Sequence, residues 1–363
     1  MRVLIAGGGT GGHIYPAIAI AKAFKEMNPQ VSVEFVGTQT GLESRLVPQA
    51  GYKIHFVEAG RFNQVSIWTK LKTLLCFPLA VLRSAILLKK IKPDVVLGVG
   101  GFVSLPVVLT AALLGKKTFI WEPNAYPGLA NRLLSRFVSH CFVVFNEAAR
   151  HFNGAKSSKV HMPVRQEIEN ANLAKQKSDK FKVLIFGGSQ GARAINNAII
   201  DLVKNENAWV QQLHIIHQTG ANDISRVKSI YDSLDVDKKN IEVVEYIDDM
   251  PNKYAWADLV IARAGTGTIS ELAACSKAAI LIPLPTAADD HQTKNAMALV
   301  QIGGAKLIKQ SDLSATILKT EIDRFKKHPN ELLQIETQIR KFHHPRAAGD
   351  IVDKITKQLE LSK

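Results

Sequence analysis

Short apolar runs that end in glycine or polar residues recur along the chain, and longer stretches with helical apolar spacing separate them. Residues 2–6 form the first run and stop at three glycines, after which residues 14–27 show the spacing of a helix. Further runs of the same kind occupy residues 31–36, 94–99, 118–121, 182–186, 213–217, 241–244, 259–262 and 279–283. Strands alternating with helices predict an α/β fold built on doubly wound parallel sheets.

This pattern starts again in the middle of the chain. The run at 182–186 leads into Gly187-Gly188-Ser189-Gln190-Gly191-Ala192, which repeats the strand and glycine loop of the N-terminus. Residues 157–180 between the two halves are polar and rich in lysine, and 363 residues suit two domains better than one. We predict two Rossmann-like domains facing across a cleft, 1–160 and 161–340, with a final helix in 341–363 packing back on the first.

Composition narrows the class of protein. With 46% hydrophobic and 21% charged residues the chain is typical of a folded globular protein. Three widely spaced cysteines predict neither a disulfide framework nor a close-spaced metal site, and the N-terminus does not resemble a signal peptide. A net charge of +14 favours a polyanionic partner, which includes nucleic acid, a phosphorylated substrate and anionic lipid.

The first glycine loop, residues 7–13, precedes a helix. Glycines at this place let backbone N–H groups approach a phosphate, although they also serve tight packing of a strand against a helix. A dinucleotide site would add an acidic residue after the second strand, but here that strand ends Val36-Gly37-Thr38 and its counterpart ends His217-Gln218-Thr219. The missing acidic residue disfavours hydride transfer. Neither loop continues into Lys-Ser/Thr, which disfavours P-loop chemistry as well.

The second half carries two polar clusters after predicted strands. Residues 263–273 form a loop of small residues that opens a helix, where Glu271 would either complement the helix dipole or chelate ribose hydroxyls. Residues 283–296 crowd polar side chains at a strand's carboxyl end, which suits a hydroxyl-rich ligand or a solvated turn capped by Asp289 or Asp290.

Taken together these motifs resemble the MurG family of GT-B-type glycosyltransferases over nearly the whole chain. The resemblance is carried by Gly8-Gly9-Thr10-Gly11-Gly12-His13, Gly98-Val99-Gly100-Gly101, Trp121-Glu122-Pro123-Asn124, the 187–192 loop, Tyr246-Ile247-Asp248-Asp249-Met250, residues 263–271 and His291-Gln292-Thr293-Lys294-Asn295-Ala296. It implies inverting transfer of N-acetylglucosamine from its UDP derivative to the C4 hydroxyl of lipid I. The products are lipid II and UDP, and the step belongs to peptidoglycan synthesis.

The resemblance also implies roles by position. In the first domain, which would hold the acceptor, Thr10, Gly11, Gly12 and Asn124 would bind substrate together with His13 and Glu122. In the second, Ser189 would meet the donor phosphates, Ile247 the uracil, Glu271 the ribose and Gln292 the sugar. Arg165 would lie on the donor side, and Thr266, Gly267, Thr268, Ile269 and Ser270 would line the donor site.

Two positions depart from the family pattern. The family usually has Gly-Asn where this chain has His161-Met162, which weakens the assignment of Arg165. It usually has tyrosine at the position of Phe102, so no hydrogen-bonding role is assigned there.

The chemistry requires a base for the acceptor hydroxyl and groups that hold the charge growing on UDP. His13 is the first candidate for the base, Glu122 is its rival, and His13 would otherwise only hydrogen-bond an acceptor phosphate. Backbone N–H groups of the glycine loops would hold the charge. We predict no catalytic metal and no cofactor.

Residues 61–92 are basic and apolar, with no acidic residue. The cations are Arg61, Lys70, Lys72, Arg83, Lys89, Lys90 and Lys92, and the apolar side chains include Ile67, Trp68, Leu71, Leu74, Leu75, Phe77, Leu79, Val81, Leu82 and Ile86. The segment is too interrupted to span a bilayer and suits peripheral binding to the anionic cytoplasmic face of the inner membrane. A helix packed on the sheet with a basic outer face is the alternative.

Two other functions remain at this point. A GT-B transferase with a diacylglycerol acceptor would share the donor loops and the basic apolar segment. A nucleic-acid-binding protein would suit the charge, but there is no recognisable binding motif and no row of aromatic residues for base stacking, so no nucleic-acid partner is predicted.

Overall fold

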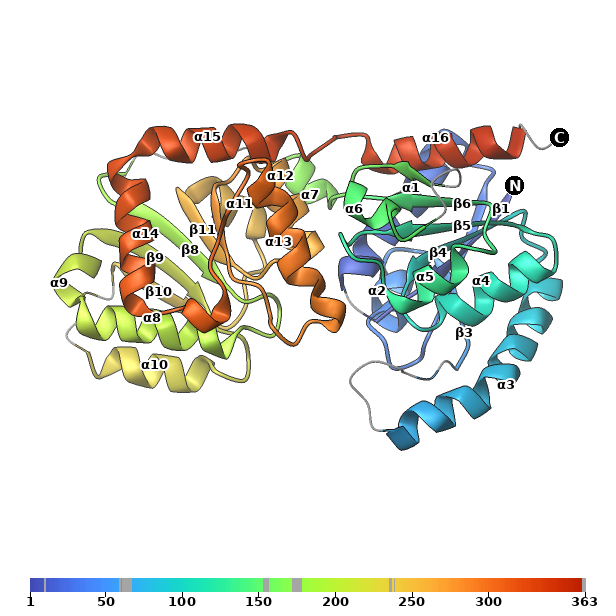
Figure 1. Ribbon diagram of the computed structural model, residues 1–363, viewed down its shortest axis with the longest axis horizontal. Coiled ribbons are helices and arrows are strands. Elements are labelled where there is room, and N and C mark those ends of the chain that lie inside the picture. The colour runs from blue at the N-terminus through green and yellow to red at the C-terminus, as the bar shows by residue number, and fades with distance from the viewer. Residues whose placement is uncertain are drawn as a thin grey trace. The chain divides into compact units, whose positions relative to one another are not determined.

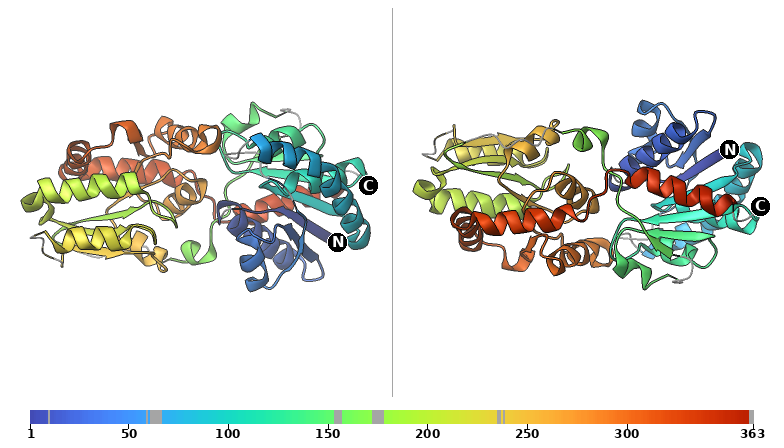
Figure 2. Two further views of the ribbon diagram at one scale, coloured as in Figure 1. Left: turned by 90° about the horizontal axis from the view of Figure 1, so that it is seen from below. Right: turned by 90° about the horizontal axis from the view of Figure 1, so that it is seen from above.

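The computed structural model describes residues 1–9, 11–58, 60, 67–152, 157–171, 178–234, 237 and 239–360; within 67–74 it describes only the side chains of Trp68 and Thr73. The chain divides into two compact units, residues 1–165 with 344–363 and residues 166–343. Each unit is an α/β layer structure with helices on both faces of a parallel sheet (Figures 1 and 2). The predicted fold class is therefore confirmed.

The first unit contains a parallel seven-stranded sheet in the order β3-β2-β1-β4-β5-β6-β7. Its strands are β1 (Arg2–Gly7), β2 (Ser32–Gly37), β3 (Lys53–Phe56), β4 (Val95–Gly100), β5 (Lys117–Glu122), β6 (His140–Val143) and β7 (Ser157–Lys159). Its helices are α1 (Gly11–Met27), α2 (Glu43–Gln49), α3 (Ile67–Ile91), α4 (Ser104–Leu113), α5 (Leu129–Leu134), α6 (Asn146–Ala149) and α16 (Ala347–Glu360). The strand order reverses between β1 and β4, which makes their carboxyl ends the switch point of this sheet.

The second unit contains a six-stranded parallel sheet in the order β10-β9-β8-β11-β12-β13. Its strands are β8 (Phe181–Phe186), β9 (Leu213–Gln218), β10 (Ile241–Val244), β11 (Leu259–Ala262), β12 (Ala279–Leu281) and β13 (Lys306–Leu307). Its helices are α7 (Gln166–Glu169), α8 (Arg193–Asn205), α9 (Asn207–Val210), α10 (Ile224–Asp232), α11 (Met250–Trp256), α12 (Thr266–Ala274), α13 (His291–Gln301), α14 (Ala315–Lys327) and α15 (Pro329–Arg340), with short 3₁₀ turns at Ala288–Asp290 and Gln310–Asp312. Here the switch point lies between β8 and β11.

The cores explain why these segments form these elements. The central strands β1, β4, β8 and β11 are almost wholly buried and apolar, as expected of parallel strands covered on both faces. Helix α8 buries Ile195, Ile199, Leu202 and Val203, which recur at helical spacing and pack on the sheet of the second unit. Helix α16 packs on α1, where the Thr356 hydroxyl lies 3.6 Å from the sulfur of Met27.

Four strands were not predicted from the sequence: β3, β6, β7 and β13. Three of them, β3, β7 and β13, lie at sheet edges, and their residues are less thoroughly buried than those of central strands. The polar stretch that we expected to link the domains contains β7, which pairs with β6, and the short helix α7. The unit boundary falls after Arg165.

A buried polar network ties α8 to the end of β9 in the second unit. Neutral His217 donates from Nε2 to Asn196 Oδ1 at 3.1 Å and accepts from the Tyr231 hydroxyl at Nδ1, also at 3.1 Å. The Asn196 amide in turn donates to the Thr219 carbonyl at 3.0 Å and to Asp223 at 2.7 Å. Burial lowers the pKa of His217 to about 3, against a weaker opposing effect of Asp223.

This network predicts an acid-sensitive second unit. Because the folded pKa of His217 is depressed, the unfolded chain binds a proton more readily below pH 6.5. Stability is therefore lost as the pH falls from about 6.5 toward 3, by up to about 1.4 kcal/mol per pH unit from this group. Urea denaturation of His217→Gln across pH 7 to 4.5 should show a flatter pH dependence than the wild type. His214→Gln, on the same strand, is the control, and equal slopes for His217→Gln and the wild type would contradict the assignment.

Candidate functional site

Two glycine turns meet at the switch point of the first sheet. The Gly8 amide donates to the Gly100 carbonyl at 3.2 Å, and a Cβ on Gly101 would lie 2.5 Å from the Gly8 carbonyl oxygen. Gly100 and Gly101 have φ angles of +100° and +84°, which side chains rarely allow. Glycine is therefore required here both for the backbone conformation and for the approach of the two turns.

His13 lies in the first turn of α1 and packs on the β4 turn. A Cβ built on Gly100 would lie 2.8 Å from His13 Cε1 and 2.9 Å from Nδ1, so the imidazole covers the α-carbon of this glycine. The ring is partly buried, as are Gly11 and Gly12 at the helix start. Thr10, also predicted to be a site residue, lies outside the described residues.

A buried carboxylate that the sequence analysis missed holds the first glycine turn. Glu43 is 1% exposed and accepts hydrogen bonds from the Gly9 amide at 2.9 Å, the Thr38 amide at 2.9 Å and the Thr38 hydroxyl at 2.7 Å. Burial raises the pKa of its carboxyl, but the hydrogen bonds from Gly9, Thr38 and its own backbone outweigh this, so the pKa lies below its ordinary value.

The glycines around Glu43 were the available signal for it. A Cβ at Gly8, Gly37 or Gly41 would lie within 2.5 Å of a Glu43 side-chain atom. Gly37 ends β2 and Gly41 lies in the loop that leads from there to Glu43, whereas Gly8 follows β1, and only the fold shows that Gly8 meets this side chain.

Glu122, at the end of β5, holds the next loop in a similar way. Its carboxylate accepts from the Asn124 amide at 2.9 Å, the Asn124 side chain at 3.0 Å, the Gly128 amide at 3.0 Å and the Asn131 side chain at 2.9 Å. Complete burial raises the pKa of Glu122 above its ordinary value, against these four donors. The structure therefore connects Glu122 directly to the predicted site residue Asn124.

The second unit also contains two apposed turns, but they follow β8 and β9 and do not flank the switch point between β8 and β11. The glycine turn after β8 presses on the turn after β9: a Cβ on Gly191 would lie 1.8 Å from the Thr219 carbonyl oxygen, and one on Gly220 would lie 2.2 Å from that of Gln190. Gly188 and Gly191 both have positive φ. Ser189 is exposed at the tip of this turn.

On the other side of this switch point, α12 begins directly after β11. Gly265 precedes the helix in an extended conformation and Thr266 opens it, so the helix begins with backbone N–H groups of Thr266, Gly267 and Thr268. Ile269 and Ser270 are buried on its inner face. This is the polarity that an anion at the helix N-terminus requires.

Glu271 follows one turn later and has a specific partner. The hydroxyl of the buried Tyr254, in α11, donates to Glu271 Oε2 at 3.1 Å. Tyr254 was not identified from the sequence, since nothing in its spacing relates it to Glu271. Ile247, the residue expected at the uracil, is 6% exposed in the loop between β10 and α11.

Gln292 and Arg165, two further predicted site residues, each contact a residue of one unit. Gln292 accepts the Leu284 amide at 3.0 Å, which fixes the turn after β12 to the start of α13. The guanidinium of Arg165 lies 5.4 Å from the ring centre of Tyr15 on α1, so the described contact of Arg165 is in the first unit.

Arg263, the first residue of the loop before α12, hydrogen-bonds to neighbouring segments of the second unit. It is 8% exposed and donates to the carbonyls of Ile282 and Pro283 at 3.1 and 3.0 Å and to Gln310 at 2.7 Å. Through these bonds it joins the end of β11 to the end of β12, at the same edge of the sheet as α12. The sequence had shown it only as the first residue of a loop.

Comparison with known proteins gives a consistent assignment. Residues 3–143 match the family model of the glycosyltransferase family 28 N-terminal domain, and residues 182–351 match that of the family 28 C-terminal domain.

Full-length relatives carry one name. A UDP-N-acetylglucosamine--N-acetylmuramyl-(pentapeptide) pyrophosphoryl-undecaprenol N-acetylglucosamine transferase of Bdellovibrio bacteriovorus is 44% identical over 98% of both chains. The protein of that name from Myxococcus xanthus is 42% identical over 97% of this chain and 92% of its own. The crystal structure of Acinetobacter baumannii MurG is similar with a TM-score of 0.78 and 30% identity, over 98% of this chain and 99% of its own. The chain therefore belongs to glycosyltransferase family 28, within its MurG family.

Proposed function

We propose that this chain transfers N-acetylglucosamine from UDP-N-acetylglucosamine to the C4 hydroxyl of the muramoyl sugar of lipid I, with inversion, giving lipid II and UDP for peptidoglycan synthesis. The main support is the identity of 44% over 98% of both chains with a relative named for that transfer. In the first unit the two apposed glycine turns lie at the switch point, and in the second the glycine turn after β8 and the start of α12 lie there. Both places offer the backbone N–H groups that such a transfer needs.

The second unit is proposed to bind the donor. The N-terminal amides of α12 and the turn that carries Ser189 lie at one switch point, where they can accept the two phosphates of UDP. As the sugar leaves, negative charge grows on UDP, and fixed N–H groups stabilise it without reorganisation. Glu271, oriented by Tyr254, would chelate the ribose hydroxyls, Ile247 would contact the uracil and Gln292 the sugar.

The first unit is proposed to bind the acceptor. His13, held over Gly100 at the β1–β4 switch point, is the proposed base that accepts the proton of the attacking hydroxyl. Four donors already occupy the Glu122 carboxylate, which supports a positioning role: Glu122 orients Asn124 toward the acceptor. Glu43 would act in the same sense on the loop that carries Thr10, Gly11 and Gly12.

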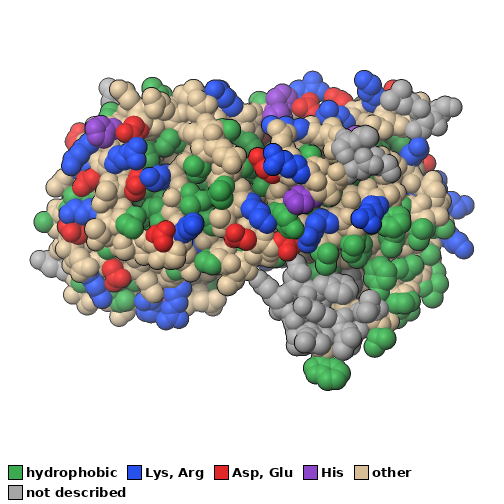
Figure 3. Space-filling model, viewed as in Figure 1, with side chains coloured by type: hydrophobic (Ala, Val, Ile, Leu, Met, Phe, Trp, Pro, Cys, Tyr) green, Lys and Arg blue, Asp and Glu red, His purple; other side chains and the backbone are tan. Residues whose placement is uncertain are grey.

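Membrane binding is proposed from the outer face of α3. Leu75, Leu79, Leu82 and Ile86 recur at helical spacing and are 81%, 47%, 56% and 62% exposed. Trp68, 81% exposed, lies about two helical turns before Leu75. Figure 3 shows hydrophobic side chains gathered over this part of the first unit. Four such side chains on one helix face are typical of an interfacial contact.

Exposed apolar residues of α5 and exposed lysines at the end of α3 add to this surface. Leu133 and Phe137, from α5 and the turn after it, are also exposed, and an apolar cavity of about 400 Å³ opens between α3, α4 and α5. Lys89, Lys90 and Lys92 follow at the end of α3, and all three are exposed. Of the predicted segment 61–92, Arg61 and the side chains of Ile67, Lys70, Leu71, Lys72 and Leu74 lie outside the described residues.

This combination supports peripheral attachment to an anionic leaflet, where leucines enter the interface and lysines contact headgroups. None of the described helices combines the length and the apolar character that crossing a bilayer requires. Because lipid I is lipid-linked and its nucleotide-sugar partner is cytoplasmic, the proposed location is the cytoplasmic face of the inner membrane. The cavity beside α3 is suited to hydrocarbon of the lipid substrate.

Transfer of radiolabelled N-acetylglucosamine tests the reaction directly. Label from UDP-N-acetylglucosamine should pass to a short-chain lipid I analogue and not to diacylglycerol. Transfer to diacylglycerol alone would support the proposed donor site but contradict the proposed acceptor.

In the same assay Glu271→Gln should raise KM for the donor roughly tenfold or more, because a charge-assisted hydrogen bond is lost. Glu331→Gln, which breaks only the surface pair with Arg324, should leave KM unchanged.

Displacing the His13 ring should slow the chemical step. His13→Ala should lower kcat by roughly 10²- to 10⁴-fold, the contribution of general base catalysis. Gly100→Ala should lower kcat as well, because the new Cβ would occupy the place of the imidazole. Donor affinity, measured by calorimetry, should be unchanged in both.

Gly115→Ala is the matched control for Gly100→Ala. Gly115 also has a positive φ, of +71°, but a Cβ there meets nothing within 4 Å. Its variant shares the backbone strain without touching the site, so its kcat should be that of the wild type. A Gly100→Ala variant with the kcat of Gly115→Ala would contradict the proposed role of the His13 ring.

Charging the exposed face of α3 should release the protein from membranes. Leu75→Glu combined with Leu82→Glu removes two side chains, each worth about 1.5–3 kcal/mol on full burial, and adds repulsion from anionic lipid. Sedimentation with phosphatidylglycerol vesicles should show at least tenfold weaker binding, with unchanged turnover of a water-soluble acceptor. Leu333→Glu, an equally accessible leucine on α15, is the control. Equal losses in both variants would exclude α3 as the docking face.

A further inference from the structure

Two histidines and one aspartate lie together in the first unit, near the places where the chain passes between its two units. His161 stands four residues before the unit boundary at Arg165, and His344 is the first residue after the chain returns. Asp350 lies in the first turn of α16. The reaction proposed above uses none of the three.

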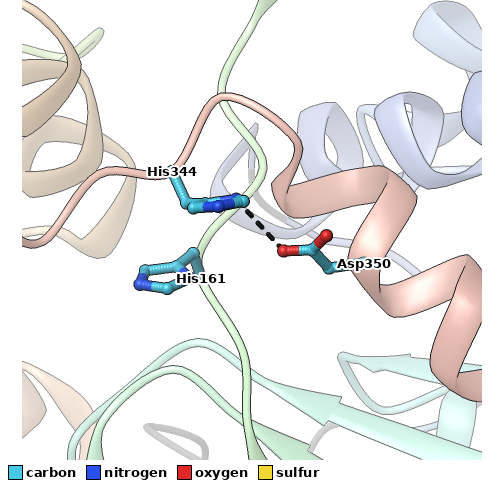
Figure 4. A group of neighbouring side chains, drawn as sticks. All are labelled: His161, His344 and Asp350. Atoms are coloured by element: carbon cyan, nitrogen blue, oxygen red, sulfur yellow. Dashed lines mark ion pairs between the residues drawn. The ribbon is translucent and has the colours of Figure 1, made fainter.

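The three side chains converge. The His161 and His344 rings are stacked, with centres 5.0 Å apart and planes 20° from parallel. One nitrogen of each histidine and one Asp350 oxygen lie within 4.8 Å of one another. Figure 4 shows the two rings facing each other and the Asp350 carboxylate turned toward His344. All three residues are partly buried, so water is partly displaced from around them.

The His344–Asp350 pair has the separation of two ligands of one ion. His344 Nδ1 lies 3.1 Å from Asp350 Oδ2. The nitrogen is buried, yet it makes no hydrogen bond of normal geometry to any described residue. Two ligand atoms at 2.0–2.1 Å from a tetrahedral zinc ion are about 3.3 Å apart. The two groups are an ion pair, drawn as a dashed line in Figure 4, and their separation is also close to that of two ligands of one ion.

We propose that His161, His344 and Asp350 bind a divalent transition-metal ion of the zinc class. The ion would cross-link the segment before the chain leaves the first unit to the segment where it returns. Two imidazoles and one carboxylate are a ligand set that zinc prefers, with a fourth position left for water. Closing the site requires the longest ligand–ligand separation, 4.8 Å, to shorten by about 1.5 Å, which side-chain rotation can provide.

A metal ion at this cluster would stabilise the packing of α16 on the rest of the first unit. His161 precedes the passage into the second unit, and His344 and Asp350 begin the return into α16, which packs on α1. A metal ion bound to all three would hold the start of α16 to the end of the first unit's main segment. Its binding energy would add to the stability of this docking, since the site does not exist in the unfolded chain.

The test uses the full-length protein, stripped with EDTA and dialysed, in a Cys76→Ser background so that the exposed thiol cannot bind metal. Titration with cobalt(II) at pH 7.5 should give one equivalent of a d–d absorption typical of a tetrahedral site, and zinc should displace it. Binding of zinc should also raise the melting temperature and slow hydrogen exchange at residues 344–351.

Ligand variants decide whether the ion sits at this cluster. His161→Gly, His344→Ala and Asp350→Asn should each weaken zinc binding roughly 10- to 100-fold or more. Among them His161→Gly introduces the residue that the MurG family usually has at this position. His55→Ala is the control, because His55 pairs with the carboxylate of Glu34 in the same unit without a second histidine. Its zinc affinity should match that of the parent protein. Absence of stoichiometric binding, or binding that survives His161→Gly undiminished, would overturn the proposal, and neither outcome bears on the glycosyl transfer.

Discussion

In each unit two backbone turns at the carboxyl ends of neighbouring strands are in close contact, and this contact limits how the loops around them can be arranged. In the first unit the turn at Gly8 lies against that at Gly101, and in the second the turn at Gly191 lies against that at Thr219. Because neighbouring strands are parallel, both turns lie at the same ends of their strands. A β-carbon on Gly101 or on Gly191 would push the facing turns apart. Both loops are thus held rigidly where a substrate's phosphates or hydroxyls would meet backbone N–H groups.

Buried polar groups then fix what the glycines leave flexible. Glu43 and Glu122 each end up beneath a loop of the first unit and accept its backbone amides, while His217 and Asn196 hold the β9 turn of the second. Each carboxylate is desolvated, so its hydrogen bonds are strong and its loss would leave several donors unpaired. The buried groups therefore fix the conformation of these loops.

The two units share a fold type but present different side chains at their surfaces. The second unit presents the start of α12 and the Tyr254–Glu271 pair, groups suited to a nucleotide. The first presents His13 at its switch point and, on α3, a row of exposed leucines followed by lysines. In the function proposed here, a single fold type would serve a water-soluble donor in one unit and a lipid-linked acceptor in the other, since the faces of the helices differ while the sheets are alike.

The fold class, the two-unit organisation and the positions of both glycine turns could be predicted from the sequence, because buried parallel strands appear as apolar runs and positive φ selects glycine. The motifs and the family resemblance also predicted His13, Glu122, Asn124 and Glu271 as site residues. The partners of these side chains became visible only in the fold. Glu43 meets Gly8 from the turn after β1, Tyr254 meets Glu271 across seventeen residues, and His161 meets His344 although the whole second unit lies between them in the sequence. Such contacts depend on strand order and loop closure, which local periodicity does not record. Edge strands such as β3 and β7 were missed for a related reason: they are only partly buried, so the apolar signal of a core strand is absent from them.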